Sequence, residues 1–338
     1  MSNLAGFKIN RNVAVVAAVL IMVTAGGLYW NLTRPQEKES IIVSTTTSLY
    51  ETGVLDALKT RFEANNPEYN VSFISQGTGL AIETAKRGDA DLILVHAPAS
   101  ELAFMESGSG VNRKIFAYNF FIVVGPESDP AGVRGIGPVE AMLKIREAGL
   151  AGNALWVSRG DNSGTHSKEK ALWKMTGLNL DEIKLETAEG SEGTWYVEAG
   201  AGMTATLQLA HQKDAYTLTD VATYLKNYKN GNIQLVKVVD SGEETLNVYS
   251  AIVCNPESSP RGMFDATMKF VQFLVSDETQ RMLETYGEEE FGATLFKPWV
   301  PELENPDSDI VKWVGEQAYF DGSECPTQYR HQAGNLYR

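Results

Sequence analysis

The sequence is poor in cysteine and histidine, two residue types that commonly form metal sites. It has 2 cysteines, Cys254 and Cys325, and 4 histidines in 338 residues. The histidines stand apart and give no metal-ligand spacing such as H-E-x-x-H. Two cysteines in an exported chain can form a disulfide, but their positions in the sequence do not show whether they meet. We expect no metal site and no cofactor.

Basic residues are also scarce. The chain has 29 Lys and Arg against 43 Asp and Glu, a formal net charge of −14. Nucleic-acid binding needs a basic face that neutralises phosphates, and no basic stretch with interleaved aromatic residues occurs. The composition therefore excludes a nucleic-acid partner. The hydrophobic content of 43% is typical of a globular protein, and 338 residues are more typical of two domains than of one.

The N-terminus carries an apolar run over residues 13–30. Lys8 and Arg11 precede it, and a polar stretch over residues 31–40 follows it. As a helix the run would be about 27 Å long, near the lower limit for crossing a bilayer. The pattern predicts export, with either a cleaved signal peptide or an uncleaved anchor, and no cysteine nearby can receive a lipid. We assign residues 1–40 to this signal or anchor and a linker.

After the linker, short apolar runs alternate with amphipathic segments. "SIIVSTT" is typical of a strand, and residues 48–67 after it indicate one helix, with Leu55, Leu58 and Phe62 on one face. "ADLILVHAP" is typical of a buried strand, and residues 263–287 indicate one long helix. This alternation predicts an α/β fold with a mostly parallel sheet.

Two similar segments divide the chain. "FIVVGPESDP" (residues 121–130) and "AIVCNPESSP" (residues 251–260) are both strand-like runs that end in Pro-Glu-Ser-x-Pro. They bracket about 120 residues, the size of a domain. We interpret them as two crossings between lobes, although the match can also be coincidence. The predicted lobes are residues 41–123 plus 246–338 for lobe I and residues 124–245 for lobe II.

Three polar loops follow predicted strands and lead directly into predicted helices. They are "STTTS" (residues 44–48), "QGTG" (residues 76–79) and "SRGDNSGTH" (residues 158–166). In open α/β sheets, ligands bind at the carboxyl ends of strands, where helix N-termini offer free N–H groups. A tetrahedral oxyanion presents only acceptors, so its site needs N–H groups, hydroxyls and close-approaching glycines. Arg159 adds a planar donor fork.

Each loop taken alone also has an explanation without a ligand. Residues 45–48 and 163–165 can simply cap helices, and Gly77 and Gly79 can be turn glycines. The glycine-rich segment over residues 198–210 can add N–H donors or form only a tight turn before a helix. The occurrence of three such loops at strand ends, one of them beside an arginine, favours an anion site.

The stretch "GDNSGTH" superficially resembles the Gly-Asp-Ser-Gly of serine proteases, with His166 close to Ser163. It lacks the Gly-x-Ser-x-Gly elbow of hydrolases, and no companion acid is identifiable by spacing. We therefore expect no catalytic residues and no enzyme, with a hydrolase as the third choice. His166 is expected in the first turn of the following helix.

The motifs "STTTS", "QGTG", "GDADLILVHAP" and "SRGDNSGTH", followed by "KEKALW", stand in an order that resembles one family. It is the tungstate-binding proteins of bacterial and archaeal ABC importers, which are similar to molybdate- and phosphate-binding periplasmic proteins. The resemblance covers residues 41–299. It implies a two-lobed, type II periplasmic binding protein, each lobe a mixed, mostly parallel sheet flanked by helices, with the ligand in the cleft between lobes.

The resemblance also implies ligand contacts, carried over motif by motif. These are Thr46, Thr47, Ser48, Thr78, Arg159, Ser163, Gly164 and Thr165. The implied function is capture of the tungstate anion and its delivery to a membrane permease, by a monomer at the periplasmic or extracytoplasmic face. The chain departs from the family in lacking a lipid-accepting cysteine near its N-terminus and in its extension after Trp299.

Two other functions remain open at this point. A molybdate or phosphate carrier would use the same donors. Phosphate usually carries a proton at neutral pH, so its site would also need an acceptor for that proton, such as Asp161 or Glu169. The chain can also be the sensory domain of an anion-responsive receptor held by its N-terminal helix. The dozen residues before that helix are too few to signal alone.

Overall fold

The computed structural model describes residue 22 and residues 38–187, 193–240 and 242–337. The predicted apolar run over residues 13–30 therefore lies outside the described residues, except for Met22. No helix within the described part of the chain is long and apolar enough to cross a membrane. From Glu39 onward the chain forms one compact unit.

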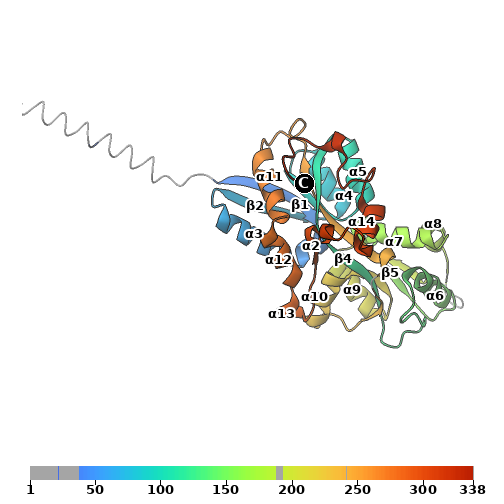
Figure 1. Cartoon of the computed structure of the whole chain (residues 1–338). Helices are drawn as coiled ribbons and strands as arrows, with labels where there is room; N and C mark the ends of the chain where they lie inside the picture. The colour runs from blue at the N-terminus through green and yellow to red at the C-terminus, as the bar shows by residue number, and fades with distance from the viewer. Residues whose placement is uncertain (1–21, 23–37, 188–192, 241, 338) are drawn as a thin grey trace, which may run out of the picture. The chain divides into compact units, whose positions relative to one another are not determined.

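Strands and helices alternate along most of this unit (Figure 1). The described strands are β1 (Glu39–Thr46), β2 (Tyr69–Gln76), β3 (Leu92–Val95), β4 (Gly110–Gly125), β5 (Trp156–Ser158), β6 (Tyr196–Glu198), β7 (Thr217–Asp220), β8 (Val236–Val239), β9 (Leu246–Cys254) and β10 (Lys297–Pro298). The described helices are α2 (Thr47–Glu51), α3 (Val54–Asn65), α4 (Thr78–Lys86), α5 (Pro98–Glu106), α6 (Pro138–Leu150), α7 (Gly164–Met175), α8 (Leu180–Ile183), α9 (Met203–Gln212), α10 (Val221–Lys229), α11 (Phe264–Leu274), α12 (Asp277–Thr285), α13 (Glu288–Phe291) and α14 (Asp309–Ala318). Short 3-10 turns are η1 (Glu243–Thr245), η2 (Val300–Glu304) and η3 (Thr327–Tyr329).

The main sheet has the strand order β10-β4-β9-β3-β1-β2, with β7 and β8 also paired to β4. Strand β1 runs parallel to β2 and β3, and β5 runs parallel to β6. Strand β9 lies between β3 and β4 and is antiparallel to both, and β7, β8 and β10 are also antiparallel to β4. The predicted α/β fold with a mixed sheet is confirmed, but "mostly parallel" is wrong for the described strands, because β4 and β9 run against their neighbours.

The two similar segments of the sequence lie in different parts of the sheet. Residues 121–125 of β4 pair with β7 and β8, whereas residues 246–254 form β9 beside β3 and the first part of β4. The pairing of β4 changes partner between Phe120 and Phe121. The lobe boundaries at residues 123 and 246 remain a prediction.

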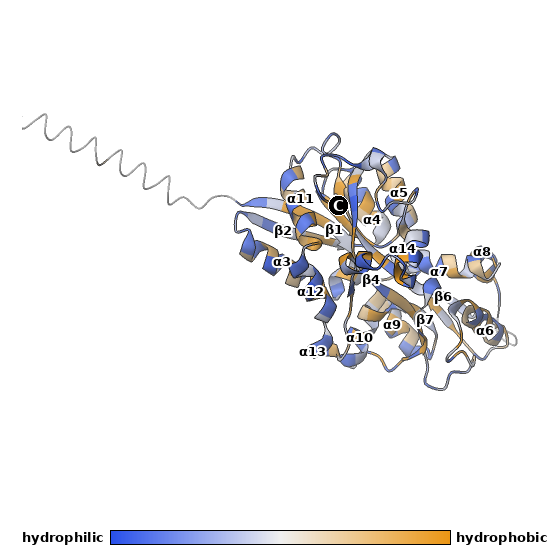
Figure 2. Ribbon diagram, in the orientation of Figure 1, coloured by the Kyte–Doolittle hydropathy of each residue, from blue (hydrophilic) through white to orange (hydrophobic). Residues whose placement is uncertain are grey.

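Separate hydrophobic clusters lie on the two sides of this change in pairing. One packs Leu55, Leu58 and Phe62 of α3 against the β1–β3 region, as the helical spacing predicted. Another surrounds Trp156, Trp173 and further aromatic side chains. Helices α3, α12 and α13 show mainly hydrophilic colouring in Figure 2. Both cysteines are buried, free thiols.

Two predicted helices are interrupted. Gly53, at φ +81°, separates α2 from α3 in a left-handed conformation that favours glycine. The long helix predicted over residues 263–287 is instead α11 and α12, so that prediction is wrong. Ser276 starts α12 by accepting a hydrogen bond from the Thr279 N–H at 3.3 Å, which is the geometry of an N-cap.

Candidate functional site

The three polar loops lie where the sequence placed them, between strand ends and helix starts. Thr46 ends β1 and caps α2, with its hydroxyl accepting from the Leu49 N–H at 3.3 Å. Gly77 precedes α4. Ser163 caps α7, accepting from the His166 N–H at 3.2 Å. The first N–H groups of a helix have no partner within the helix, so each start offers donors.

Tertiary contacts bring these loops together. Arg159 Nη2 donates to Thr47 Oγ1 at 3.3 Å, across 112 residues of sequence. A Cβ on Gly77 would lie 3.8 Å from the Asp161 carbonyl oxygen, so the second and third loops also adjoin. We call residues 46–48, 76–79 and 158–166 the loop cluster.

Most of the predicted ligand residues in the loop cluster are buried. Thr47 is partly exposed; Thr46, Ser48, Thr78, Arg159, Ser163, Gly164 and Thr165 are buried. Three of these have a buried polar atom without a hydrogen-bond partner among the described residues: Thr78 Oγ1, Thr165 Oγ1 and Arg159 Nε. Leaving such atoms unpaired inside a protein costs about 1–3 kcal/mol each, and native structures contain few of them. Their concentration in one small region indicates a polar ligand site.

Arg159 supplies the positive charge of the loop cluster. Its Nη2 lies 2.5 Å from Asp161 Oδ2, and the arginine side chain is 2% exposed. The other oxygen of Asp161 accepts from the Ser163 N–H at 3.1 Å. The carboxylate thus holds both the arginine and the start of α7, while Arg159 Nε stays available to a ligand.

His96 is a residue of this region that the sequence analysis did not select. It follows β3, and its Nε2 lies 3.3 Å from Ser48 Oγ. A Cβ on Gly164 would lie only 2.6 Å from His96 Cε1, so the ring also packs against the start of α7. Its place at a further strand end was the signal that could have identified it.

A chain of hydrogen bonds fixes the proton positions on His96. Asn119 Nδ2 donates to the Leu295 carbonyl at 3.2 Å, so Asn119 Oδ1 accepts from Asn247 Nδ2 at 2.8 Å. Asn247 Oδ1 then accepts from His96 Nδ1 at 2.8 Å. Burial lowers the pKa of His96 to about 4, so the ring is neutral at pH 7 and its Nε2 is an acceptor. Ser48 therefore donates to His96.

Glu169 supports the third loop from the protein interior. It accepts hydrogen bonds from Ser158 Oγ and Tyr196 OH, both at 2.6 Å, and from Trp156 Nε1 at 2.8 Å. Burial raises the pKa of this carboxyl group, and these donors oppose the rise. With Asp161 held by Arg159 and Ser163, neither carboxylate considered as a proton acceptor for phosphate is free of donors.

Ser163 and His166 do not form a nucleophile–base pair. The Ser163 hydroxyl contacts the backbone of His166, and His166 Nδ1 accepts from the Asn162 N–H at 3.0 Å. His166 lies in the first turn of α7, as expected. Within the described residues, no group of three or more His, Cys, Asp or Glu side chains could hold a metal ion.

The glycine-rich segment over residues 198–210 also reaches the loop cluster. It leads into α9 through Gly202, where a Cβ would lie 4.0 Å from Thr47 Oγ1. Thr204 Oγ1 donates to Glu51 Oε2 at 2.9 Å, which ties α9 to α2.

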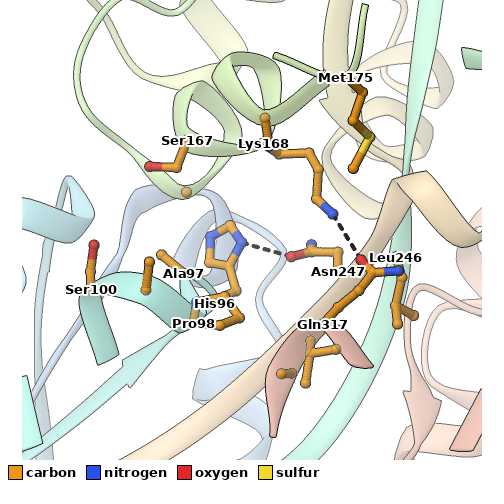
Figure 3. A pocket seen from close by; sticks show the side chains of 15 residues that line it. His96, Ala97, Pro98, Ser100, Ser167, Lys168, Met175, Leu246, Asn247 and Gln317 are labelled. Carbon is orange, nitrogen blue, oxygen red and sulfur yellow. Dashed lines mark hydrogen bonds between the residues drawn. The ribbon is translucent and has the colours of Figure 1, made fainter. Parts of the chain in front are cut away.

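A cavity of about 300 Å³ adjoins the loop cluster. In Figure 3, Ser167 and Lys168 of α7 lie across this cavity from His96 and Asn247. Lys168 Nζ donates to the Glu244 carbonyl at 3.2 Å and lies 3.4 Å from Gln317 Oε1. Burial lowers the pKa of Lys168 to about 8. The extension after Trp299 thus reaches this cavity through α14.

Comparison with known proteins agrees with the geometry. Residues 33–278 match the model of the PBP superfamily domain. The tungstate-binding protein TupA of Peptoclostridium acidaminophilum is 36% identical over 268 residues, 78% of this chain and 87% of that protein. Two solved structures are also similar. The tungstate-binding protein TupA of Desulfovibrio alaskensis G20 has a TM-score of 0.62 and 38% identity, covering 77% of this chain and 99% of that one. The tungstate ABC transporter structure from Geobacter sulfurreducens has a TM-score of 0.64 and 36% identity, covering 73% of this chain and 99% of that one.

These matches span most of the chain at identities well above those of a shared fold alone, and the three loops at strand ends lie within the matched residues 33–278. The chain belongs to the tungstate-binding protein family of ABC transporters, a family of transport proteins rather than enzymes, within the PBP superfamily.

Proposed function

We propose that the chain binds tungstate within the loop cluster and is the substrate-binding component of an ABC importer. The observation that carries this proposal is the set of unpaired, buried polar atoms on Thr78, Thr165 and Arg159. They come from two different loops, each leading into a helix start. A tetrahedral oxyanion would give acceptors to all three.

The hydrogen bonds of the two nearby carboxylates support a ligand without protons. Phosphate usually carries a proton at neutral pH and would need an acceptor. Asp161 is held by Arg159 and Ser163, and Glu169 is held by donors below the loop. Tungstate and molybdate stay deprotonated and need only donors. The names of the relatives favour tungstate over molybdate.

The ligand would stabilise the contacts that join the two sides of the site. Arg159 meets Thr47, and Gly164 meets His96, across long sequence separations. An anion that contacts both sides makes more contacts when the two sides are close together, so it stabilises this closed form of the protein. The closed form, with its anion, would then dock on a membrane permease and deliver the anion. We also propose that the chain is exported and acts as a monomer at the extracytoplasmic face, either released from its N-terminal segment or tethered by it.

The test is isothermal titration calorimetry with tungstate, molybdate and phosphate, followed by metal analysis of protein incubated with all three anions. We expect tungstate to bind most tightly and to be recovered with the protein. Ligand at a thousandfold excess over Kd adds about 4 kcal/mol to the free energy of unfolding, so the melting temperature should rise visibly. A rise with phosphate and none with tungstate would contradict the proposal.

A further inference from the structure

One face of α7 carries a group of basic residues. His166, Lys170 and Lys174 are four residues apart, so they lie along one stripe of the helix. With Lys184 and Asp181 they line a pocket of about 690 Å³ between α7 and α8, which we call the α7 lysine pocket. Helices α7 and α8 lie next to each other in Figure 1.

His166 lines this pocket and has a buried ring nitrogen without a hydrogen-bond partner among the described residues. Its Nδ1 lies 3.0 Å from the Asn162 backbone nitrogen, and because a backbone N–H can only donate, Nδ1 is the acceptor. Burial lowers the pKa of His166, with Lys170 and Lys184 contributing, so the ring is neutral. Its single N–H is therefore on Nε2. His166 is 4% exposed, and Nε2 has no hydrogen-bond partner among the described residues.

The lysines of the pocket have few opposite charges within the described part of the chain. Lys184 pairs with Glu198 at 2.6 Å. Lys170 Nζ donates to the neutral Asn162 Oδ1 at 3.2 Å, and neither Lys170 nor Lys174 has a carboxylate within ion-pair distance among those residues. A cluster of this kind is unexpected in a chain of net charge −14. Unpaired cations beside an unpaired buried N–H favour an anionic ligand.

We propose that the α7 lysine pocket is a second anion site that binds a phosphoryl group; it shares Asn162 and His166 with the loop cluster but is lined by none of the eight predicted tungstate ligands. His166 Nε2–H donates to one phosphoryl oxygen, and Lys170 and Lys174 neutralise the charge. The site does not depend on what the loop cluster binds. Free phosphate and the phosphate of a lipid headgroup offer this same chemistry.

The test titrates inorganic phosphate into protein saturated with tungstate, and follows the imidazole N–H resonances by NMR together with calorimetry. We expect the His166 Nε2–H resonance to shift saturably. His166→Asn keeps an oxygen near the place of Nδ1 for the Asn162 N–H, and its shorter side chain has no donor at the position of Nε2. Because a hydrogen bond to a charged group contributes about 1.5–3 kcal/mol, this variant should weaken phosphate binding by about tenfold or more. Because tungstate already fills the loop cluster in this experiment, a saturable shift reports phosphate in the α7 lysine pocket.

A second variant keeps the test independent of His166. Lys174→Gln should weaken phosphate by about threefold, and Lys144→Gln, on α6 beside Glu140, is the matched control that should change nothing. Flotation with phosphatidylglycerol vesicles, compared with pure phosphatidylcholine, identifies a lipid source. Binding of phosphate or of anionic vesicles that His166→Asn and Lys174→Gln both weaken supports the site. The proposal is overturned if the protein binds neither phosphate nor anionic vesicles, or if these two variants leave the binding unchanged.

Discussion

The two halves of the loop cluster differ in charge. Residues 46–48 and 76–79 contribute hydroxyl and backbone groups without a charged side chain. Residues 158–166 contribute Arg159, buried and paired with Asp161. The contact from Arg159 Nη2 to Thr47 Oγ1 joins the charged half to the neutral one. An acidic protein can therefore hold an anion, because one cation is desolvated at short range while the distant acidic surface is screened.

The two halves also differ in what stands behind them. Behind the first half lies a chain of neutral groups from Asn119 through Asn247 to His96 and Ser48. Behind the second half lies Glu169 with its several donors. Both supports accept the single hydrogen of a hydroxyl, from Ser48 or from Ser158, so these two hydroxyls hold the loops in place and leave donation to the anion to other groups. Loops that are held in place before a ligand arrives reduce the ordering cost of binding.

The largest effect should come from removing the charge. Arg159→Ala should weaken tungstate binding by about a hundredfold or more, about 3 kcal/mol, because it removes charge-assisted bonds and leaves Asp161 unpaired beside the anion. Calorimetry measures this change. Arg146→Ala, which breaks an ion pair with Glu186 outside the loop cluster, is the control and should leave the affinity unchanged. Unchanged affinity in Arg159→Ala would show that the charge of Arg159 does not contribute to tungstate binding.

The support of the first half predicts a pH dependence of stability. The pKa of His96 falls from an ordinary 6.5 to about 4 on folding. Since this base is harder to protonate when folded, its stability contribution is complete above pH 6.5 and is lost as the pH falls toward 4. The loss amounts to about 2 kcal/mol near pH ~5. Urea unfolding of the wild type and of His96→Asn, each at about pH 7 and at about pH 5, measures this loss of stability. An equal loss in the two proteins would show that His96 is not its source.

The neutral donors of the two halves should contribute equally. Thr78→Val and Thr165→Val each remove one buried hydroxyl, and each should weaken tungstate by about tenfold, about 1.4 kcal/mol. Thr60→Val on α3, whose hydroxyl donates to the Asp56 carbonyl at 2.8 Å, is the matched control. Calorimetry on the three variants checks the prediction. A large effect for one threonine with none for the other would mean that the ligand contacts only one of these two loops.

The contact between the halves predicts the smallest effect. A methyl group at Gly164 would lie 2.6 Å from His96 Cε1, so Gly164→Ala should force the two sides apart and weaken tungstate by about fivefold, about 1 kcal/mol. Gly77→Ala, whose methyl group would meet Asp161 at an ordinary 3.8 Å, is the matched control and should change little. Equal affinities in calorimetry would show that the ring moves aside without cost.

Patterns of residues adjacent in the sequence predicted much of the fold and of the candidate site. The α/β alternation, the three loops and their helix starts follow from residues adjacent in sequence, and the structure has them at the predicted places. The antiparallel course of β9 was not predictable, because pairing with β3 and β4 joins residues more than a hundred positions apart. The break before α12 was missed, since an apolar spacing does not show that Ser276 caps a new helix.

The role of His96 depends on tertiary structure in the same way. Its partner Asn247 is 151 residues away, and only a chain of hydrogen bonds that begins at a backbone carbonyl decides which ring nitrogen carries the proton. The sequence by itself determined which residue types end the strands, and so the chemistry of an oxyanion site. The tertiary structure decided which of their polar atoms are already paired, as on Ser48 and Asp161, and which remain for a ligand, as on Thr78 and Thr165, because burial and long-range contacts bring together groups that are far apart in the sequence.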